Sequence, residues 1–317
     1  MTRPIAKPPY ASARTRRRRG SSSPLRSALI VALLLTCVFS LPTIVEAARS
    51  VLPARAGLTG EPGPGQAAEQ VALSGVEQGA CVSFGRSEKT VFIDPGHGGF
   101  DPGVVGMSGG RQVLEKDVAL AVGTRLAALL RDGGFRVVMS RTEDSSVTIL
   151  GPNDTVTGAL TDSAEHRDLV TRAACANAAG ASVLVSIHFD AFDDPAVGGT
   201  ETFYDAERPF AAENKRLAAD LQSALVAGLG TSDRGVWTDD QLAAPTLTAS
   251  GSLYGHLIEL GPAATGWVDN PSQMPGALVE PLFLTNASEA KLASSSSGQQ
   301  QVAAALNAGL QKYLGGG

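Results

Sequence analysis

Cysteine and long hydrophobic runs are both scarce in this chain of 317 residues. Only three cysteines are present, and Cys37 lies in an apolar segment near the N-terminus. The other two, Cys81 and Cys175, can therefore form at most one disulfide bridge within the chain. The longest apolar run, residues 28–41, is shorter than the roughly 20 residues that a membrane-spanning helix needs.

Basic residues are scarce outside the N-terminal segment. Residues 1–48 contain eight Lys and Arg and one acidic residue, whereas the rest contains 18 basic and 30 acidic residues, a net charge of −12. An acidic body of this kind argues against nucleic acid as a partner. The length is sufficient for one or two domains with a sizeable hydrophobic core.

The N-terminal segment has the order of features that is typical of a signal peptide. The basic residues Arg16–Arg19 precede the apolar run, and Val45-Glu46-Ala47 resembles a small-residue cleavage site. We predict a signal peptide over residues 1–47, with an uncleaved membrane anchor as the alternative. The mature protein is then expected in the periplasm, the cell wall or outside the cell, without stable membrane association. Because disulfides persist there, we expect a Cys81–Cys175 bridge, the alternative being two separate buried thiols.

Residues 48–88 are rich in Gly, Pro, Ala, Gln and Glu and lack a sustained hydrophobic period, which predicts a linker or extended arm. From residue 89 to residue 317, strand and helix patterns alternate, which predicts one α/β domain with helices on both faces of a sheet. The segments 141–163 and 230–276 are expected to be irregular, apart from a strand within 253–260. The expected strands are 90–94, 135–140, 182–187, 200–204 and 277–281, and the expected helices are 115–132, 165–179, 209–229, 288–293 and 299–314.

Three residues at element ends are candidate metal ligands. His97 lies between glycines in Asp94-Pro95-Gly96-His97-Gly98-Gly99, directly after a strand, and His188 directly follows a continuous apolar strand. Glu115 opens the helix that follows the His97 loop. Taken singly, each has an ordinary explanation: a solvated turn histidine, a packed core histidine and an acid at the positive end of a helix.

Together these residues point to a zinc site. In a parallel α/β sheet, ligands bind beyond the carboxyl ends of the strands, so His97, His188 and Glu115 are expected at the same edge. Two His and one Glu form a catalytic zinc set that leaves a fourth position for water. Glu280, at the end of another expected strand, is placed to act as the general base.

Four motifs occur in an order that resembles the zinc-dependent N-acetylmuramoyl-L-alanine amidases of the amidase 3 family, stand-alone actinobacterial type. The resemblance covers about residues 90–314 and rests on four segments: Asp94–Gly99, Glu115-Lys116-Asp117, Ser186-Ile187-His188, and Leu278-Val279-Glu280 with Phe283–Asn286. It implies a twisted, mostly parallel sheet flanked by helices. It also implies one Zn²⁺ per chain on His97, Glu115 and His188, with Glu280 as the catalytic carboxylate and Asp94 or nearby carbonyls orienting a ligand imidazole.

The resemblance further implies hydrolysis of the amide between N-acetylmuramic acid and L-alanine in peptidoglycan or muropeptide fragments. A monomer is expected. Two departures from the family pattern stand beside the site: Asp190 occupies a position that is usually Asn, and Pro281 follows the catalytic Glu in place of Gly. The alternative functions are a catalytically weak peptidoglycan-binding or regulatory module and a zinc peptidase acting on the stem peptide. His256 and Glu259 compete weakly as site residues.

Overall fold

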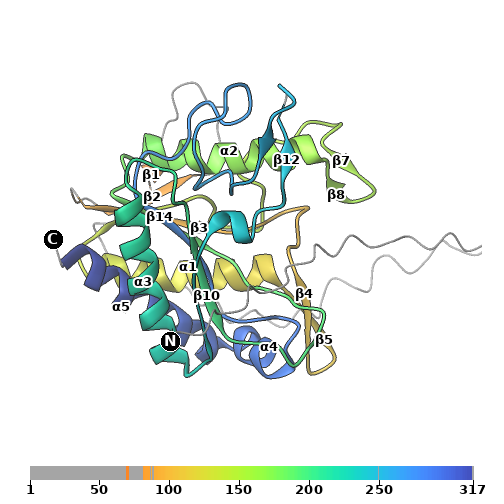
Figure 1. The fold of residues 1–317 in the computed structure, drawn as a ribbon. Coiled ribbons are helices and arrows are strands. Elements are labelled where there is room, and N and C mark those ends of the chain that lie inside the picture. Colours follow the sequence, from red (N-terminus) through yellow and green to blue (C-terminus); the bar gives the residue numbers. More distant parts are fainter. Residues whose placement is uncertain (1–68, 71–80, 86, 88, 249, 316–317) are drawn as a thin grey trace, which may run out of the picture. The chain divides into compact units, whose positions relative to one another are not determined.

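A single eight-stranded sheet forms the centre of the folded unit (Figure 1). The computed structural model describes residues 69–70, 81–85, 87, 89–248 and 250–315, so the expected signal peptide lies outside the described residues. The strand order is β1-β2-β6-β3-β9-β14-β10-β11. These strands are β1 Glu69–Gln70, β2 Val82–Phe84, β3 Thr90–Pro95, β6 Arg136–Met139, β9 Val183–Ile187, β10 Thr200–Tyr204, β11 Asp233–Thr238 and β14 Gly276–Glu280.

The middle of the sheet is parallel, as the α/β pattern and the family resemblance predict. Strands β6, β3, β9 and β14 all run in the same direction, and β10 is antiparallel to β14 but parallel to β11. At the other edge, β2 is antiparallel to β6 and β1 is antiparallel to β2. The segment Val82–Phe84, within the expected linker, therefore belongs to the sheet.

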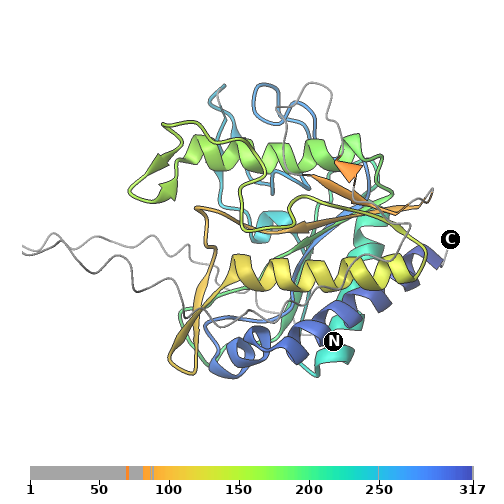
Figure 2. The ribbon, with the colours of Figure 1, turned by 180° about the vertical axis from the view of Figure 1, so that it is seen from behind.

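Helices cover both faces of the sheet (Figures 1 and 2). The helix α2, Asp162–Ala178, lies on one face. The other face carries α1 Glu115–Asp132, α3 Ala211–Leu229 and α5 Ser296–Gly315, with the short α4 Ala287–Ser294 leading into α5. The mixed α/β class and the helices on both faces are confirmed.

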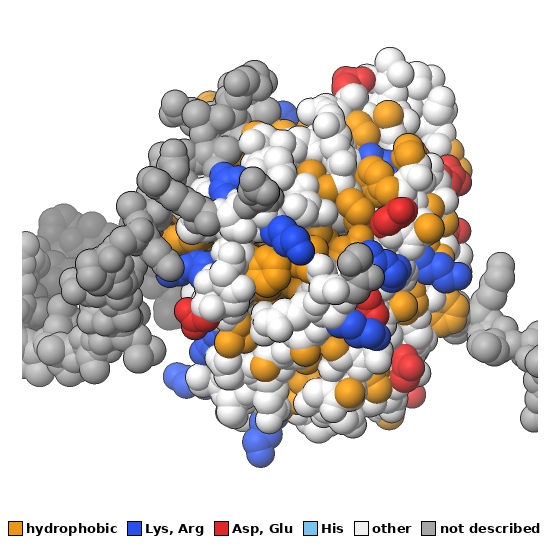
Figure 3. Space-filling model, turned by 90° about the vertical axis from the view of Figure 1, so that its left-hand side faces the viewer, with side chains coloured by type: hydrophobic (Ala, Val, Ile, Leu, Met, Phe, Trp, Pro, Cys, Tyr) orange, Lys and Arg blue, Asp and Glu red, His pale blue; other side chains and the backbone are white. Residues whose placement is uncertain are grey.

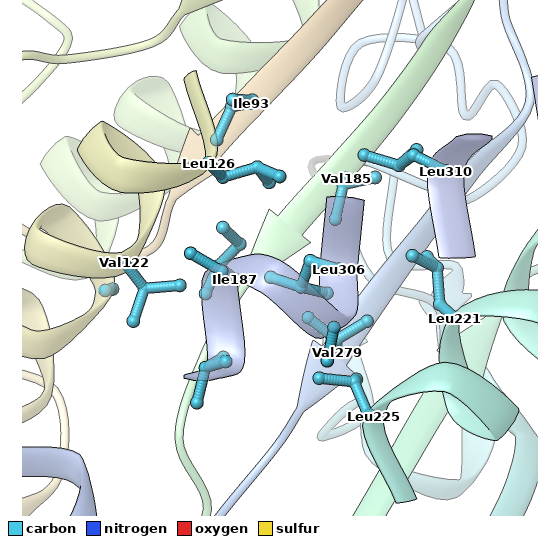
Figure 4. Packing of buried hydrophobic residues seen from close by; sticks show 14 of the residues in the cluster. Ile93, Val122, Leu126, Val185, Ile187, Leu221, Leu225, Val279, Leu306 and Leu310 are labelled. Carbon is cyan, nitrogen blue, oxygen red and sulfur yellow. The ribbon is translucent and has the colours of Figure 1, made fainter. Parts of the chain in front are cut away.

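Side chains alternate between two cores, because successive residues of a strand point to opposite faces. Ile93, Val185 and Val279 point toward α1, α3 and α5, where they pack against Leu126 and Leu306 (Figure 4). The second core, on the α2 face, contains Phe92, Val138, Leu184, Phe203 and Leu278. Each central strand is thus buried on both sides, which explains its continuous apolar sequence.

The expected disulfide is confirmed. Cys81 and Cys175 are bridged, with their Cα atoms 6.1 Å apart, and both are fully buried in the α2-face core. The bridge ties the start of β2 to the last turns of α2. It joins parts of the chain that are 94 residues apart in sequence.

The segments expected to be irregular contain more structure than predicted. Asp233–Thr238 forms the edge strand β11, although its sequence, Asp-Arg-Gly-Val-Trp-Thr, lacks an apolar run because an edge strand is only half buried. The 253–260 strand is confined to β13, Leu253–Tyr254, which pairs with β12, Thr246–Leu247. Small hairpins also form from β7, Thr155–Val156, with β8, Ala159–Leu160, and from β4, Val105–Ser108, with β5, Arg111–Leu114.

Among the described residues, none of the helices combines the length and the hydrophobicity needed to cross a membrane. On the face shown in Figure 3, Lys and Arg side chains are dispersed among hydrophobic and uncharged ones, and acidic side chains lie mostly toward the right of the view. This part of the surface therefore carries charges of both signs.

Candidate metal centre

The loop after β3 holds His97 in an unusual backbone conformation. His97 has φ of 60°, and Gly98 and Gly99 also have positive φ. A non-glycine residue in this region carries strain that the surrounding structure has to support. Arg172 and Arg141 provide that support, because Arg172 donates to the carbonyl of His97 and Arg141 donates to the carbonyl of Gly96.

Three side chains point their ligand atoms toward one another. His97 Nε2 is 3.0 Å from Glu115 Oε1, and His188 Nδ1 is 3.1 Å from both of those atoms. A tetrahedral zinc ion with bonds of about 2.0 Å has ligand atoms separated by about 3.3 Å. The three atoms therefore form a face on which such an ion fits, with one further position open for water.

The topology explains why these residues meet. Asp94 and Pro95 pair with Ser186 and Ile187, so the loop after β3 and the residue after β9 lie at the same sheet edge. Glu115 is the first residue of α1 and is 2% exposed. Its carboxylate accepts hydrogen bonds from the backbone N–H groups of Val104 and Phe189, which fix its orientation.

A neighbouring carboxylate orients His97. Asp101 Oδ2 is 2.6 Å from His97 Nδ1, so a proton on Nδ1 leaves Nε2 free as a ligand atom. The sequence predicts Asp94 or nearby carbonyls in this role. Asp94 instead binds Arg172 and Ser186. Asp101 is not predicted from the sequence because it lies four residues after His97 in an irregular loop. Which side chains meet in such a loop depends on how the turn folds.

The negative charge of Glu115 affects the pKa of His97. Burial lowers the pKa of His97, but Glu115 and Asp101 outweigh this effect and raise it to about 10. Burial also opposes ionisation of Glu115, yet His97 and His188 bring its pKa well below the usual range. The site thus favours a carboxylate beside a positive charge, and a bound divalent cation would supply that charge in place of the proton on His97.

Glu280 stands beside the three ligand candidates at the end of β14. Val279 pairs with Ile187, and the N–H of His188 donates to the carbonyl of Val279. Glu280, the last residue of β14, therefore lies next to His188, which directly follows β9. Glu280 is 5% exposed, and its Oε2 accepts no hydrogen bond within the described part of the chain. Burial raises its pKa well above the ordinary value, with contributions from Asp190 and Glu115.

Further carboxyl groups surround Glu280. Glu201, on β10, lies directly opposite it in the antiparallel pair of β10 and β14 and contacts Arg234. Burial, followed by the interaction with Glu201, raises the pKa of Asp190 to about 8. The raised pKa favours the neutral carboxylic acid form of Asp190, which can donate a hydrogen bond as an Asn at that position would.

A pocket lies on the α2 face beside His97 and His188, which both line it. Its walls come from α2 and from the segment around Leu257–Leu260, and Glu259 is within 4.0 Å of Arg172. A ligand bound in this pocket would contact both polar and apolar side chains. The lining consists of His97, Asp101, Leu160, Glu165, Asp168, Leu169, Arg172, His188, Leu257, Ile258, Glu259, Leu260 and Leu278.

Comparison with known protein families agrees with this geometry. Residues 91–312 match the family Amidase_3, described as N-acetylmuramoyl-L-alanine amidase. The chain belongs to this family. The match spans the strands and helices that carry His97, Glu115, His188 and Glu280, and the family is one of metal-dependent hydrolases.

Individual amidases show how far the similarity extends. The chain is 32% identical to the germination-specific N-acetylmuramoyl-L-alanine amidase of Bacillus subtilis, over 72% of this chain and 81% of that protein. It is also 32% identical to the amidase LytC of the same organism, but spans only 35% of the length of LytC. The structure of the CwlD amidase from Clostridioides difficile, solved in complex with the GerS lipoprotein, has a TM-score of 0.56 and 28% identity, covering 73% of this chain and all of that one.

Proposed function

We propose that this amidase is an exported zinc enzyme that cleaves the amide between N-acetylmuramic acid and L-alanine of the peptidoglycan stem peptide. The observation that carries the proposal is the set of three ligand atoms within 3.0–3.1 Å of one another beside a buried carboxyl group. Family membership supports the choice of bond, since the matching family is described by that activity.

His97, Glu115 and His188 would hold the ion, and Asp101 would keep the His97 ring in the required tautomer. A zinc ion at this position supplies Lewis-acid activation of the scissile carbonyl and of a water molecule. Glu280 accepts a proton from the attacking water and transfers it to the leaving amide nitrogen, so that the C–N bond breaks with no net change of charge. Burial raises the pKa of Glu280, and a cation bound nearby would favour the carboxylate form that accepts this proton.

Product analysis of digested peptidoglycan tests the reaction. Mass spectrometry should find free stem peptides that begin with L-alanine and glycan strands that retain their lactyl groups. A shortened stem peptide still attached to the glycan would indicate a zinc peptidase instead. Binding without any product would indicate the non-catalytic module.

Two variants separate the proposed roles. Glu280→Gln should keep zinc and peptidoglycan binding, while turnover falls by roughly 10²- to 10⁴-fold, because the amide cannot accept a proton. His188→Ala should lose both metal and turnover. Glu213→Gln, an exposed position on α3, is the matched control and should behave as wild type. Wild-type turnover in Glu280→Gln would place the general base elsewhere, and loss of zinc would make Glu280 a ligand.

We propose for the remaining chain that residues 1–47 are removed on export, that residues 48–88 form an arm leading to the catalytic domain of residues 89–317, and that the mature protein is a monomer. Bridging of Cys81 and Cys175 supports export, because such bonds persist outside the cytoplasm.

A further inference from the structure

A second group of potential metal ligands lies at the ends of β10 and β11. The two strands are parallel, with Tyr204 paired to Thr238, so the residues that follow them, Asp205 and Asp239, stand side by side. Asp205 is fully buried and Asp239 is 1% exposed. Two carboxylates so deeply buried need a positive partner.

A single nitrogen of His256 faces both carboxylates. Its Nδ1 is 2.9 Å from Asp205 Oδ2 and 3.3 Å from Asp239 Oδ1. A ring nitrogen carries at most one hydrogen, so it cannot make a good hydrogen bond to both oxygens. Accordingly, Asp205 Oδ2 is buried and accepts no hydrogen bond from the residues that the structure describes.

The other atoms of the three side chains already have partners, which leaves these three atoms facing one another. Asp205 Oδ1 accepts from the N–H of Glu207, and Asp239 Oδ2 accepts from the N–H of Leu257. Glu207 Oε2 lies 3.5 Å from His256 Nε2 and favours a proton there, so Nδ1 is the nitrogen that could bind a cation held between the two carboxylates.

The guanidinium of Arg208 donates its hydrogen bonds to backbone carbonyls and not to Asp205. Arg208 interacts electrostatically with Asp205, but its guanidinium donates to the carbonyls of Leu260, Gly261 and Ser272. It therefore holds the neighbouring loop, and no residue in the described part of the chain donates a hydrogen bond to Asp205 Oδ2.

We propose that Asp205, Asp239 and His256 bind a second divalent cation, separate from the one at His97, Glu115 and His188. The two groups share no residue, and all three ligand atoms of the second group lie within 4.8 Å of one another. Two carboxylate oxygens and one imidazole nitrogen suit zinc or manganese, because imidazole favours the former and carboxylates the latter.

The position of this site indicates a role in shaping the pocket. His256 directly precedes Leu257, Ile258 and Glu259, which line the pocket beside His97 and His188. A cation that joins His256 to the ends of β10 and β11 fixes this wall against the sheet. The inference does not depend on which bond the enzyme cleaves.

Metal counting in the purified, full-length protein tests the proposal. The protein is loaded with zinc or with manganese, freed of excess metal by gel filtration, and measured by inductively coupled plasma mass spectrometry. Wild type should hold two equivalents. Asp239→Asn and His256→Gln should each hold one, as should His97→Ala, and a protein with both His97→Ala and Asp239→Asn should hold none.

Asp240→Asn, at the exposed neighbour of Asp239, is the control and should hold two equivalents. A single equivalent in wild type that is lost in His97→Ala but kept in Asp239→Asn would overturn the proposal and leave a shared proton as the partner of the two aspartates. Failure of the proposed function is seen separately, in the digestion products. Because the wild-type count alone can refute the second site, the test holds even if a variant does not fold.

Discussion

Gly96 leaves the space that the His188 ring occupies. A Cβ atom on Gly96 would lie 2.3 Å from His188 Cε1, closer than any real contact. Gly103 has the same function for Glu115 and His97, whose atoms would lie 2.5 Å and 2.6 Å from its Cβ. The glycines of the loop thus serve two purposes, since Gly98 and Gly99 permit positive φ whereas Gly96 permits close packing.

Substituting Gly96 should therefore weaken metal binding. Gly96→Ala is expected to displace the His188 ring and lower zinc affinity by at least 10-fold, in the range found when ligand orientation is disturbed. Zinc affinity is measured by competition with a chelator. Gly315→Ala, where a Cβ would meet no atom within 4 Å, is the control. Unchanged affinity in Gly96→Ala would mean that the His188 ring is not constrained by this contact.

Glu259 makes stability depend on pH. Burial, and then the negative charge of Asp94, raise its pKa well above the ordinary value. Above the unfolded-state pKa of about 4.3, the folded protein keeps a proton that the unfolded chain has released, so this group lowers stability as pH rises.

Glu259→Gln should remove that dependence. The amide keeps a donor toward Asp94 without the need to hold a proton, so the variant is expected to be more stable than wild type by about 1–2 kcal/mol at pH 7, and equal to it near pH 4. The free energy of unfolding is measured by urea titration at both values of pH. Equal stabilities at pH 7 would contradict the raised pKa.

At the scale of elements, α2 connects the disulfide with the metal centre. Its last turns carry Cys175, and Arg172, one turn earlier, binds Asp94, Asp168 and the carbonyls of Pro95 and His97. The C-terminal part of α2 thus supports the strained loop through Arg172 and is tied to the start of β2 through Cys175.

Removing the disulfide should destabilise the fold without emptying the site. The double variant Cys81→Ala, Cys175→Ala is expected to lose about 2–5 kcal/mol of unfolding free energy, because its unfolded chain regains the freedom of a long loop. Urea titration measures the loss, and reduction of wild type provides the matched comparison. Zinc content should stay at the wild-type level, since Arg172 still holds the loop. Loss of zinc in a folded variant would show that the bridge itself positions α2.

At the scale of the whole molecule, the proposed export has a direct consequence. Protein recovered from outside the cytoplasm should lack residues 1–47, because the basic stretch and apolar run match a signal peptide. Intact-mass spectrometry should find a chain beginning near residue 48. A chain that keeps its N-terminus and remains with the membrane fraction would identify the apolar run as an anchor.

The periodic sequence of this protein was enough to predict its layers. Continuous apolar runs in β3 and β9 predicted buried central strands, and α1 was expected over the residues where it occurs. Edge features were missed because burial leaves a weaker pattern there: β11 has one face exposed, and the β4–β5 hairpin is signalled mainly by Gly109 and Gly110.

The sequence by itself determined the family, the α/β class and the set of residues at one sheet edge, since each of these depends on short motifs next to regular elements. Only the tertiary structure decided which atoms face one another. Strand β10 is antiparallel to β14, which places Glu201 opposite Glu280. The side chain that contacts His97 Nδ1 is Asp101 and not Asp94. The pairing of β10 with β11 places Asp205 beside Asp239, and the loop that contains His256 brings its ring next to both. Such contacts depend on the direction and register of strands far apart in the chain, which local sequence does not encode.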